Sequence, residues 1–230
     1  MSKKLGWSVC LLTLALCVSA LPAMSGTLFS DLGPTGNDYN CCSGWTVSGT
    51  GTVGTSFTAA NLFTLGGTGL QTIDQIDLGV GYVTGVNTFY AAIYASSGGS
   101  NPVPTGPALD TWMPLSGCQF FGSECGLVTI NVGGALQLTG NTQYFMVLGP
   151  ISTSDTSWEA WNWNNQNVNG LDLYSTDGGT TWNSNGTQPL GAFDVIGHQS
   201  GGTTPEPSSL LLLGTGLIGA VGAIRRKLNR

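Results

Sequence analysis

The segment SWEAWNWNNQN, residues 157–167, combines residue types that bind sugars, because aromatic faces stack on pyranose rings and amides hydrogen-bond hydroxyls. In an extended strand Trp161 and Trp163 share one face, and Trp158 lies on the opposite face from Trp161. The sequence therefore predicts a sugar-binding platform on Trp161 and Trp163, with Trp158 as a further candidate. The competing interpretation is that these indoles are core residues, since tryptophan is usually well buried.

Two carboxylates beside these tryptophans, Asp155 and Glu159, are the best candidates for catalysis. Glycoside hydrolysis needs two carboxylates that face each other across a cleft, and nothing in the spacing shows that these two do. A nucleophile–histidine–carboxylate site has no good candidate, because His198 is the single histidine and lies where the domain is expected to end. We therefore expect no enzymatic activity and assign no catalytic residue.

Calcium is the one cofactor for which the sequence leaves room, because carboxylates without cationic neighbours suit a hard cation. Asp74 with Asp77, or Asp172 with Asp177, could contribute ligands, although the chain has no DxDxDG loop. Zinc is disfavoured because the cysteines lack paired CxxC spacing and there is one histidine. The expectation is therefore no cofactor and no assigned metal site, with calcium as the open alternative.

The N-terminus has the three-part layout of a secretory signal peptide. Lys3 and Lys4 precede an apolar stretch over residues 11–18, and small residues follow up to residue 23. We therefore predict that residues 1–23 are a signal peptide, removed when the protein is exported.

Basic residues are confined to the two ends of the chain. All six Lys and Arg lie within residues 1–4 and 225–230, whereas all twelve Asp and Glu lie between residues 31 and 206. An acidic body without cations repels phosphate groups, which excludes nucleic acid as a partner. Because no Lys or Arg salt bridge can form there, the stability of the body must come from burial and backbone hydrogen bonds.

Four cysteines remain after the signal peptide, and an even number in an exported chain favours disulfide bonds. The favoured pair is Cys118 with Cys125, which closes the short loop GCQFFGSEC. Cys41 and Cys42 would then form a strained adjacent pair, or each would cross-link separately to the 118–125 loop. The connectivity stays open among these alternatives.

The segment TPEPSSLLLLGTGLIGAVGAIRRKLNR, residues 204–230, has three parts: a Pro-Glu-Pro turn, an apolar run over residues 208–224 and a basic cluster. The apolar run of 17 residues is at the short end for a membrane-spanning helix. The basic cluster predicts that its end stays on the cytoplasmic side. Residues that define the signal are Pro205, Glu206, Pro207, Arg225, Arg226 and Lys227.

These three parts, in this order and beneath a signal peptide, resemble the PEP-CTERM sorting signal of Gram-negative bacteria. The resemblance covers residues 205–230 and implies processing by an exosortase-type membrane enzyme that cuts near the Pro-Glu-Pro turn. It also implies hosts that make extracellular polysaccharide and biofilm. The alternative is a permanent single-pass membrane anchor.

Short apolar runs punctuated by Gly, Ser, Thr and Asn fill residues 24–197, which predicts one all-β domain, an antiparallel β-sandwich or jelly roll. Residues 98–110 are the longest expected loop, and residues 198–204 are an expected flexible linker. STDGGTTW, residues 175–182, fits the Asp-box pattern and predicts a hairpin turn stabilised by Asp177, with Trp182 beneath it. The predicted strands are 27–32, 44–48, 56–65, 72–83, 88–96, 127–132, 143–148, 157–164, 171–174 and 192–196.

The body is also similar to exported bacterial sandwich domains of the choice-of-anchor type. The resemblance is carried by TLFSDLG, by the IYASSGGSNPVPTGPAL loop, by TQYFMVL, and by STDGGTTW leading to GAFDVIGH. It implies a sandwich architecture and no assigned activity.

These observations together predict an exported protein that is held in the envelope membrane by its C-terminal helix and reaches the cell surface or medium after processing. The leading hypothesis is a structural or adhesive role in an exopolysaccharide-rich envelope. The alternative is a carbohydrate-binding module that uses the Trp161 and Trp163 platform, and a glycan hydrolase ranks below it. Expected partners are the exosortase-type enzyme, extracellular polysaccharide and the membrane.

Overall fold

A computed structural model describes residues 25–118, 120–123 and 126–200. The predicted signal peptide, residues 1–23, and the predicted sorting and transmembrane segment, residues 205–230, lie outside this part of the chain. Within the described part, no helix has the length and apolar character needed to cross a membrane.

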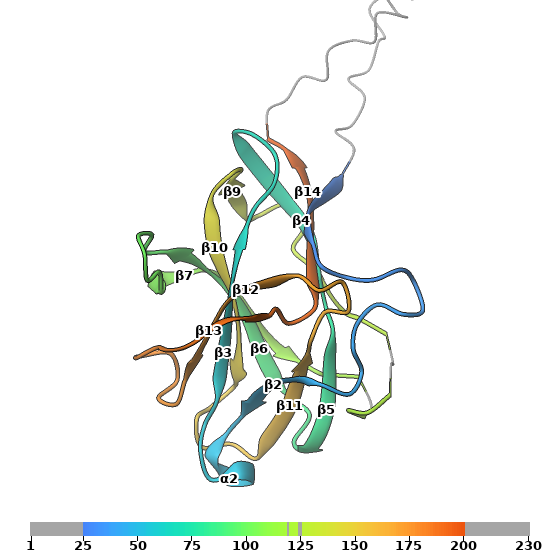
Figure 1. The fold of residues 1–230 in the computed structure, drawn as a ribbon, viewed down its shortest axis with the longest axis vertical. Coiled ribbons are helices and arrows are strands. Elements are labelled where there is room, and N and C mark those ends of the chain that lie inside the picture. Colours follow the sequence, from blue (N-terminus) through green and yellow to red (C-terminus); the bar gives the residue numbers. More distant parts are fainter. Residues whose placement is uncertain (1–24, 119, 124–125, 201–230) are drawn as a thin grey trace, which may run out of the picture. The chain divides into compact units, whose positions relative to one another are not determined.

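The described chain consists of short strands and one short helix (Figure 1). Its elements are, in order, β1 (Gly26–Ser30), β2 (Gly44–Ser48), α2 (Thr50–Val53), β3 (Thr58–Thr64), β4 (Leu70–Leu78), β5 (Val80–Gly85), β6 (Phe89–Ser96), β7 (Pro104–Leu115), β8 (Val128–Asn131), β9 (Gln137–Thr139), β10 (Gln143–Pro150), β11 (Ser157–Asn162), β12 (Asn169–Ser175), β13 (Asn183–Pro189) and β14 (Phe193–Gln199).

The strands form three sheets whose ladders are all antiparallel, which confirms the predicted all-β class. The six-stranded sheet has the order β13-β12-β3-β10-β6-β7. The five-stranded sheet has the order β1-β14-β4-β8, with β9 also paired to β4. The three-stranded sheet has the order β2-β11-β5.

One large hydrophobic core receives buried side chains from all three sheets. Strand β10 lies at the centre of the six-stranded sheet, and its Tyr144, Met146 and Leu148 point into this core. The alternate residues Phe145 and Val147 belong to a second, smaller cluster on the other face of the same sheet. Both faces are buried, as the continuous apolar run TQYFMVLG predicts.

The strand prediction is wrong where turn-rich segments pair with a neighbour. Strand β7 begins inside the expected loop 98–110 and pairs with β6, and β13, whose sequence is NSNGTQP, pairs with β12. Strand β9, which was not predicted, pairs with β4. The single strand expected over residues 72–83 is two strands, β4 and β5, separated by Gly79. Strand β14 runs on through Gln199, so the first residues of the expected linker belong to the sheet. Pairing with an existing edge supplies backbone hydrogen bonds even where side chains carry no apolar pattern.

The turn between β12 and β13 has the hydrogen bonds expected of an Asp box. The Asp177 carboxylate accepts the backbone N–H of Thr181 at 2.8 Å and the Ser175 hydroxyl at 2.7 Å. These hydrogen bonds lower the pKa of Asp177 to about 2, the Thr181 backbone contributing most. Gly178 and Gly179 take the positive φ angles of 71° and 88° that the turn requires. Trp182 packs against the smaller hydrophobic cluster, which confirms the predicted hairpin.

Candidate functional site

Trp161 is a core residue, so the predicted platform on Trp161 and Trp163 is wrong. The Trp161 side chain is fully buried, and its Nε1 donates a hydrogen bond to the carbonyl oxygen of Ala192 at 3.2 Å. A Cβ atom on Gly191 would lie 2.3 Å from the indole, so the backbone at Gly191 packs directly against the ring. The ring therefore offers no face to a sugar.

The other two tryptophans of this segment are partly buried. Strand β11 ends at Asn162, so the alternation that would align Trp163 with Trp161 does not continue. Trp163 packs instead against Trp45, with 5.3 Å between ring centroids, and its Nε1 is buried without a hydrogen-bond partner. Trp158 lies at the start of β11. The structure therefore does not gather these tryptophans on one exposed face.

The carboxylates proposed for catalysis do not form an open pair. Glu159 is fully buried, and burial raises its pKa to about 8; the backbone of Thr88 opposes this shift and the charge of Asp155 adds to it. Neither Glu159 carboxyl oxygen has a well-formed hydrogen bond. Asp155 instead stabilises a turn, where it accepts the backbone N–H groups of Ser152 at 3.2 Å and Ser157 at 3.0 Å. A buried acid cannot contact a glycosidic bond, so this pair lacks the geometry that hydrolysis requires.

Ser25, Asp74 and His198 lie together, although the order of their contacts is not that of a catalytic triad. Asp74 Oδ2 accepts the Ser25 hydroxyl at 2.5 Å and lies 2.8 Å from Nδ1 of His198. Asp74 therefore stands between the serine and the histidine, whereas a triad needs the histidine in that position as the base for the serine.

The carboxylates proposed as calcium ligands belong to separate hydrogen-bond networks. Asp74 binds His198, whereas Asp77 accepts the Thr129 hydroxyl at 2.5 Å. Asp177 stabilises its own turn, and Asp172 binds two asparagines described below. In residues 25–118, 120–123 and 126–200 no group of three or more His, Cys, Asp or Glu side chains could hold a metal ion.

Cys41 and Cys42 lie beside Gly122, four residues after Cys118. Cys118 is disulfide-bonded, and Cys125, its predicted partner, lies outside the described residues. The carbonyl oxygen of Cys41 accepts the backbone N–H of Gly122 at 2.9 Å. Cys42 is exposed and carries a free thiol, so it is not bonded to Cys41 in this structure. The pairing of Cys118 with Cys125 stays a prediction.

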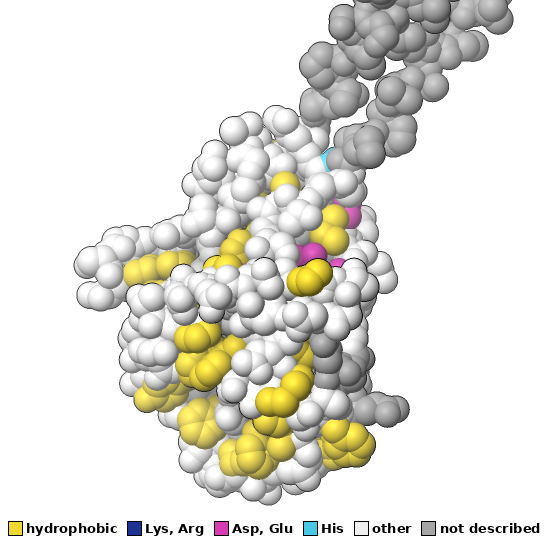
Figure 2. Space-filling view, turned by 45° about the vertical axis from the view of Figure 1, so that its right-hand side comes forward, with side chains coloured by type: hydrophobic (Ala, Val, Ile, Leu, Met, Phe, Trp, Pro, Cys, Tyr) yellow, Lys and Arg dark blue, Asp and Glu magenta, His cyan; other side chains and the backbone are white. Residues whose placement is uncertain are grey.

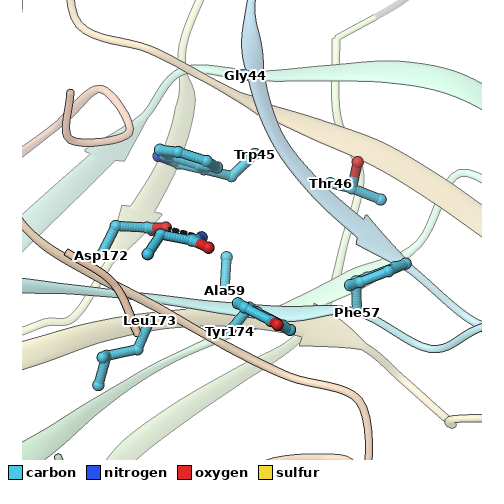
Figure 3. A pocket seen from close by; sticks show the side chains of 9 residues that line it. Gly44, Trp45, Thr46, Phe57, Ala59, Asp172, Leu173 and Tyr174 are labelled. Atoms are coloured by element: carbon cyan, nitrogen blue, oxygen red, sulfur yellow. Dashed lines mark hydrogen bonds between the residues drawn. The ribbon is translucent and has the colours of Figure 1, made fainter. Parts of the chain in front are cut away.

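A pocket of about 430 Å³ opens between β2 of the three-stranded sheet and β12 of the six-stranded sheet. Figure 3 shows Trp45 across the pocket from Tyr174 and Phe57, with Asp172 at one end and Ala59 between them. The Phe57 and Tyr174 ring centroids lie 6.4 Å apart. The pocket therefore has aromatic walls and a polar end.

The polar end of the pocket is held by a chain of hydrogen bonds that begins at the backbone. Gly191 N–H donates to Asn61 Oδ1 at 2.6 Å, and Asn61 Nδ2 donates to Asp172 Oδ1 at 2.6 Å. Asn185, on β13, donates its Nδ2 to Asp172 Oδ2 at 2.5 Å (Figure 3). Burial raises the pKa of Asp172 to about 6, and the two amides oppose this shift. Each oxygen of Asp172 accepts one amide N–H, which favours the ionised carboxylate and fixes its orientation.

The aromatic wall is equally constrained. Trp45 Nε1 donates to the carbonyl oxygen of Pro189 at 3.0 Å, and the ring packs against Trp163. Sequence reasoning placed Trp45 and Tyr174 in strands but did not identify this pocket, because β2 and β12 belong to different sheets and are far apart in the chain. No local motif joins the two residues, so no signal in the sequence could have paired them.

Comparison with known proteins identifies the C-terminal tail. No curated protein and no solved structure matches the chain. The resemblance of the body to choice-of-anchor domains is confirmed by no named family. A family model described as the PEP-CTERM protein-sorting motif matches residues 203–227, which include the Pro-Glu-Pro turn and the basic cluster Arg225, Arg226 and Lys227. The chain therefore carries a PEP-CTERM protein-sorting motif, which implies an exported protein that an exosortase-type enzyme processes.

Proposed function

We propose that this protein is exported, sorted by an exosortase-type enzyme, and then acts as a structural or adhesive component of an exopolysaccharide-rich envelope. The PEP-CTERM motif at residues 203–227 is the observation that carries the proposal. The layout of the N-terminus as a signal peptide supports it, because both ends then serve export and sorting.

The distribution of charge also supports a separation between terminal targeting segments and a mature domain. Every Lys and Arg lies in a terminal segment, so removal of both segments would leave a mature domain with no Lys or Arg. The tail holds the protein in the membrane until it is cut near Pro205-Glu206-Pro207. The mature domain then acts without catalysis and without nucleic acid, through contacts with polysaccharide or with other matrix proteins.

The sorting step is tested by the intact mass of the protein in separated membrane and extracellular fractions of its native host. We expect the extracellular form to end near residues 205–207. A variant with both Pro205→Ala and Pro207→Ala is expected to stay full-length in the membrane, while Pro189→Ala, outside the motif, is processed normally. A parent protein that keeps residue 230 and is confined to membranes would instead mean a permanent anchor.

The adhesive role is tested in the same host by deletion of the gene. We expect the mutant to shed more polysaccharide from its surface on washing, and the full-length gene to restore retention. A mutant that retains its matrix as the parent does would reject the structural or adhesive role and leave the sorting proposal standing.

A further inference from the structure

We propose that the pocket between Trp45 and Tyr174 binds a neutral pyranose unit of a polysaccharide. The proposal deepens the adhesive role stated above by naming its ligand class, and it rests on that role for its biological meaning. Its physical basis lies within the described β domain, so its test does not depend on the fate of the tail.

The size and walls of the pocket suit a sugar ring. A volume of about 430 Å³ lies within the range of small-molecule sites, roughly 300–1,000 Å³. Pyranose rings have apolar C–H faces that stack on aromatic rings, and Trp45 and Tyr174 provide such rings on two sides (Figure 3). Because Trp45 is already held by Pro189 and Trp163, little side-chain freedom is lost when a ligand binds.

The polar end of the pocket can form hydrogen bonds with hydroxyl groups. Asp172 is 1% exposed, so its part is to hold the Asn185 amide in one orientation at the end of the pocket. Asn185 is exposed at the rim and uses one N–H on Asp172, so its amide offers a further donor and an acceptor. Fixed donors and acceptors beside an aromatic face are the arrangement that orients a polyhydroxylated ring.

The charge of the site selects a neutral ligand. The described domain has no Lys or Arg, as Figure 2 illustrates for one face, and the carboxylate of Asp172 repels a uronic acid. An amino sugar gains little in return, because its ammonium group would lose water on entering the pocket and the Asp172 charge is already hydrogen-bonded by two amides. The ligand class that remains is an uncharged hexose unit.

The test is a titration of the full-length protein with cellohexaose, maltohexaose and laminarihexaose, followed by tryptophan fluorescence and calorimetry. Hexamers of galacturonic acid and of glucosamine serve as charged counterparts. We expect at least one neutral hexamer to bind with one site per chain, and both charged hexamers to bind at least about tenfold more weakly.

Substitutions then locate the binding. We expect Tyr174→Ala to weaken binding at least about tenfold and Asn185→Ala about fivefold, because each removes one ligand contact. Phe120→Ala is the matched control, since Phe120 is 63% exposed and does not line the pocket. Thermal unfolding followed by circular dichroism verifies that the variants are folded. If Tyr174→Ala does not fold, Asn185→Ala still tests the proposal, because residue 185 is exposed.

Three results would overturn the proposal: no binding of any neutral hexamer at millimolar concentration, equal binding of the charged hexamers, or unchanged affinity in folded Tyr174→Ala and Asn185→Ala. Failure here is distinguishable from failure of the sorting proposal. A protein that stays full-length in membranes but still binds the neutral hexamer would reject the sorting step alone.

Discussion

Trp45 and Trp161 lie opposite each other on adjacent strands β2 and β11, but they serve different purposes. Trp161 is fully buried and donates its N–H to Ala192, whereas Trp45 lines the pocket and donates its N–H to Pro189. Trp45 therefore hydrogen-bonds to the end of β13, and Trp161 to the segment just before β14. Trp161 packs in the core, whereas Trp45 lines the pocket.

This relationship predicts unequal effects of substitution on stability. Trp161→Ala should lower the free energy of unfolding by about 3–5 kcal/mol, because it leaves a cavity and an unpaired Ala192 carbonyl. Trp45→Phe keeps an aromatic ring and loses one hydrogen bond, so about 1 kcal/mol is expected. Urea unfolding measures both values. Equal values for the two variants would contradict the assignment of Trp161 to the core and Trp45 to the pocket.

The domain buries several carboxyl groups although it has no Lys or Arg to pair with them. Asp31 illustrates the arrangement: its Oδ1 accepts the backbone N–H of Phe193 at 2.7 Å, and its Oδ2 is buried without a partner. Burial is the main cause of the raised pKa in each case, and the charge of Asp77 raises the pKa of Asp194 further. The raised values are about 8 for Asp31 and Glu159, about 7 for Asp194 and about 6 for Asp172.

These groups predict a protein that is more stable in mild acid than in alkali. An unfolded carboxyl group ionises near pH 4, so the unfolded state gains charge first as pH rises. The contribution of these groups to stability is therefore complete below about pH 4 and is lost as pH rises through their folded values, between about 6 and 8. Calorimetry should show a Tm at pH 8.5 below that at pH 5, by on the order of 10 °C.

Glu159→Gln isolates one of these groups, because glutamine is neutral at every pH. We expect the variant to match the parent at pH 5 and to exceed its Tm at pH 8.5, so that the pH dependence flattens. Asp110→Asn, at a partly exposed position whose carboxylate accepts the N–H of Thr111, is the control and should leave the slope unchanged. A parent Tm that rises between pH 5 and pH 8.5 would contradict the raised pKa values of these buried acids.

Asp177 predicts the opposite pH dependence at the β12–β13 turn. Hydrogen bonds from Thr181 and Ser175 lower its pKa to about 2. The contribution of Asp177 to stability is therefore present above about pH 4 and is lost as pH falls through 2. Asp177→Ala should lower the Tm at pH 7 and approach the parent near pH 2. Hydrogen exchange of the Thr181 amide gives a local readout, and unchanged protection in the variant would rule out this role.

Much of the fold was predictable from local pattern. Strand β2 matches its predicted range of residues 44–48, and the apolar run of β10 correctly indicated a strand covered on both faces. The Asp-box turn followed from side chains that bond within their own segment, which is why STDGGTTW was sufficient. Strands β7 and β13 were missed because edge pairing, and not side-chain pattern, places them.

The sequence by itself determined the sorting motif, the confinement of cations to the two ends and the all-β class, because each depends on composition or on neighbouring residues. Only the tertiary structure decided that Trp161 and Glu159 are buried and that Trp45 meets Tyr174 across a pocket. Alternation along a strand shows which residues share a face, but the sheet that covers that face is chosen by pairing between segments that are distant in the chain. The pocket between Trp45 and Tyr174 therefore depends on that long-range pairing.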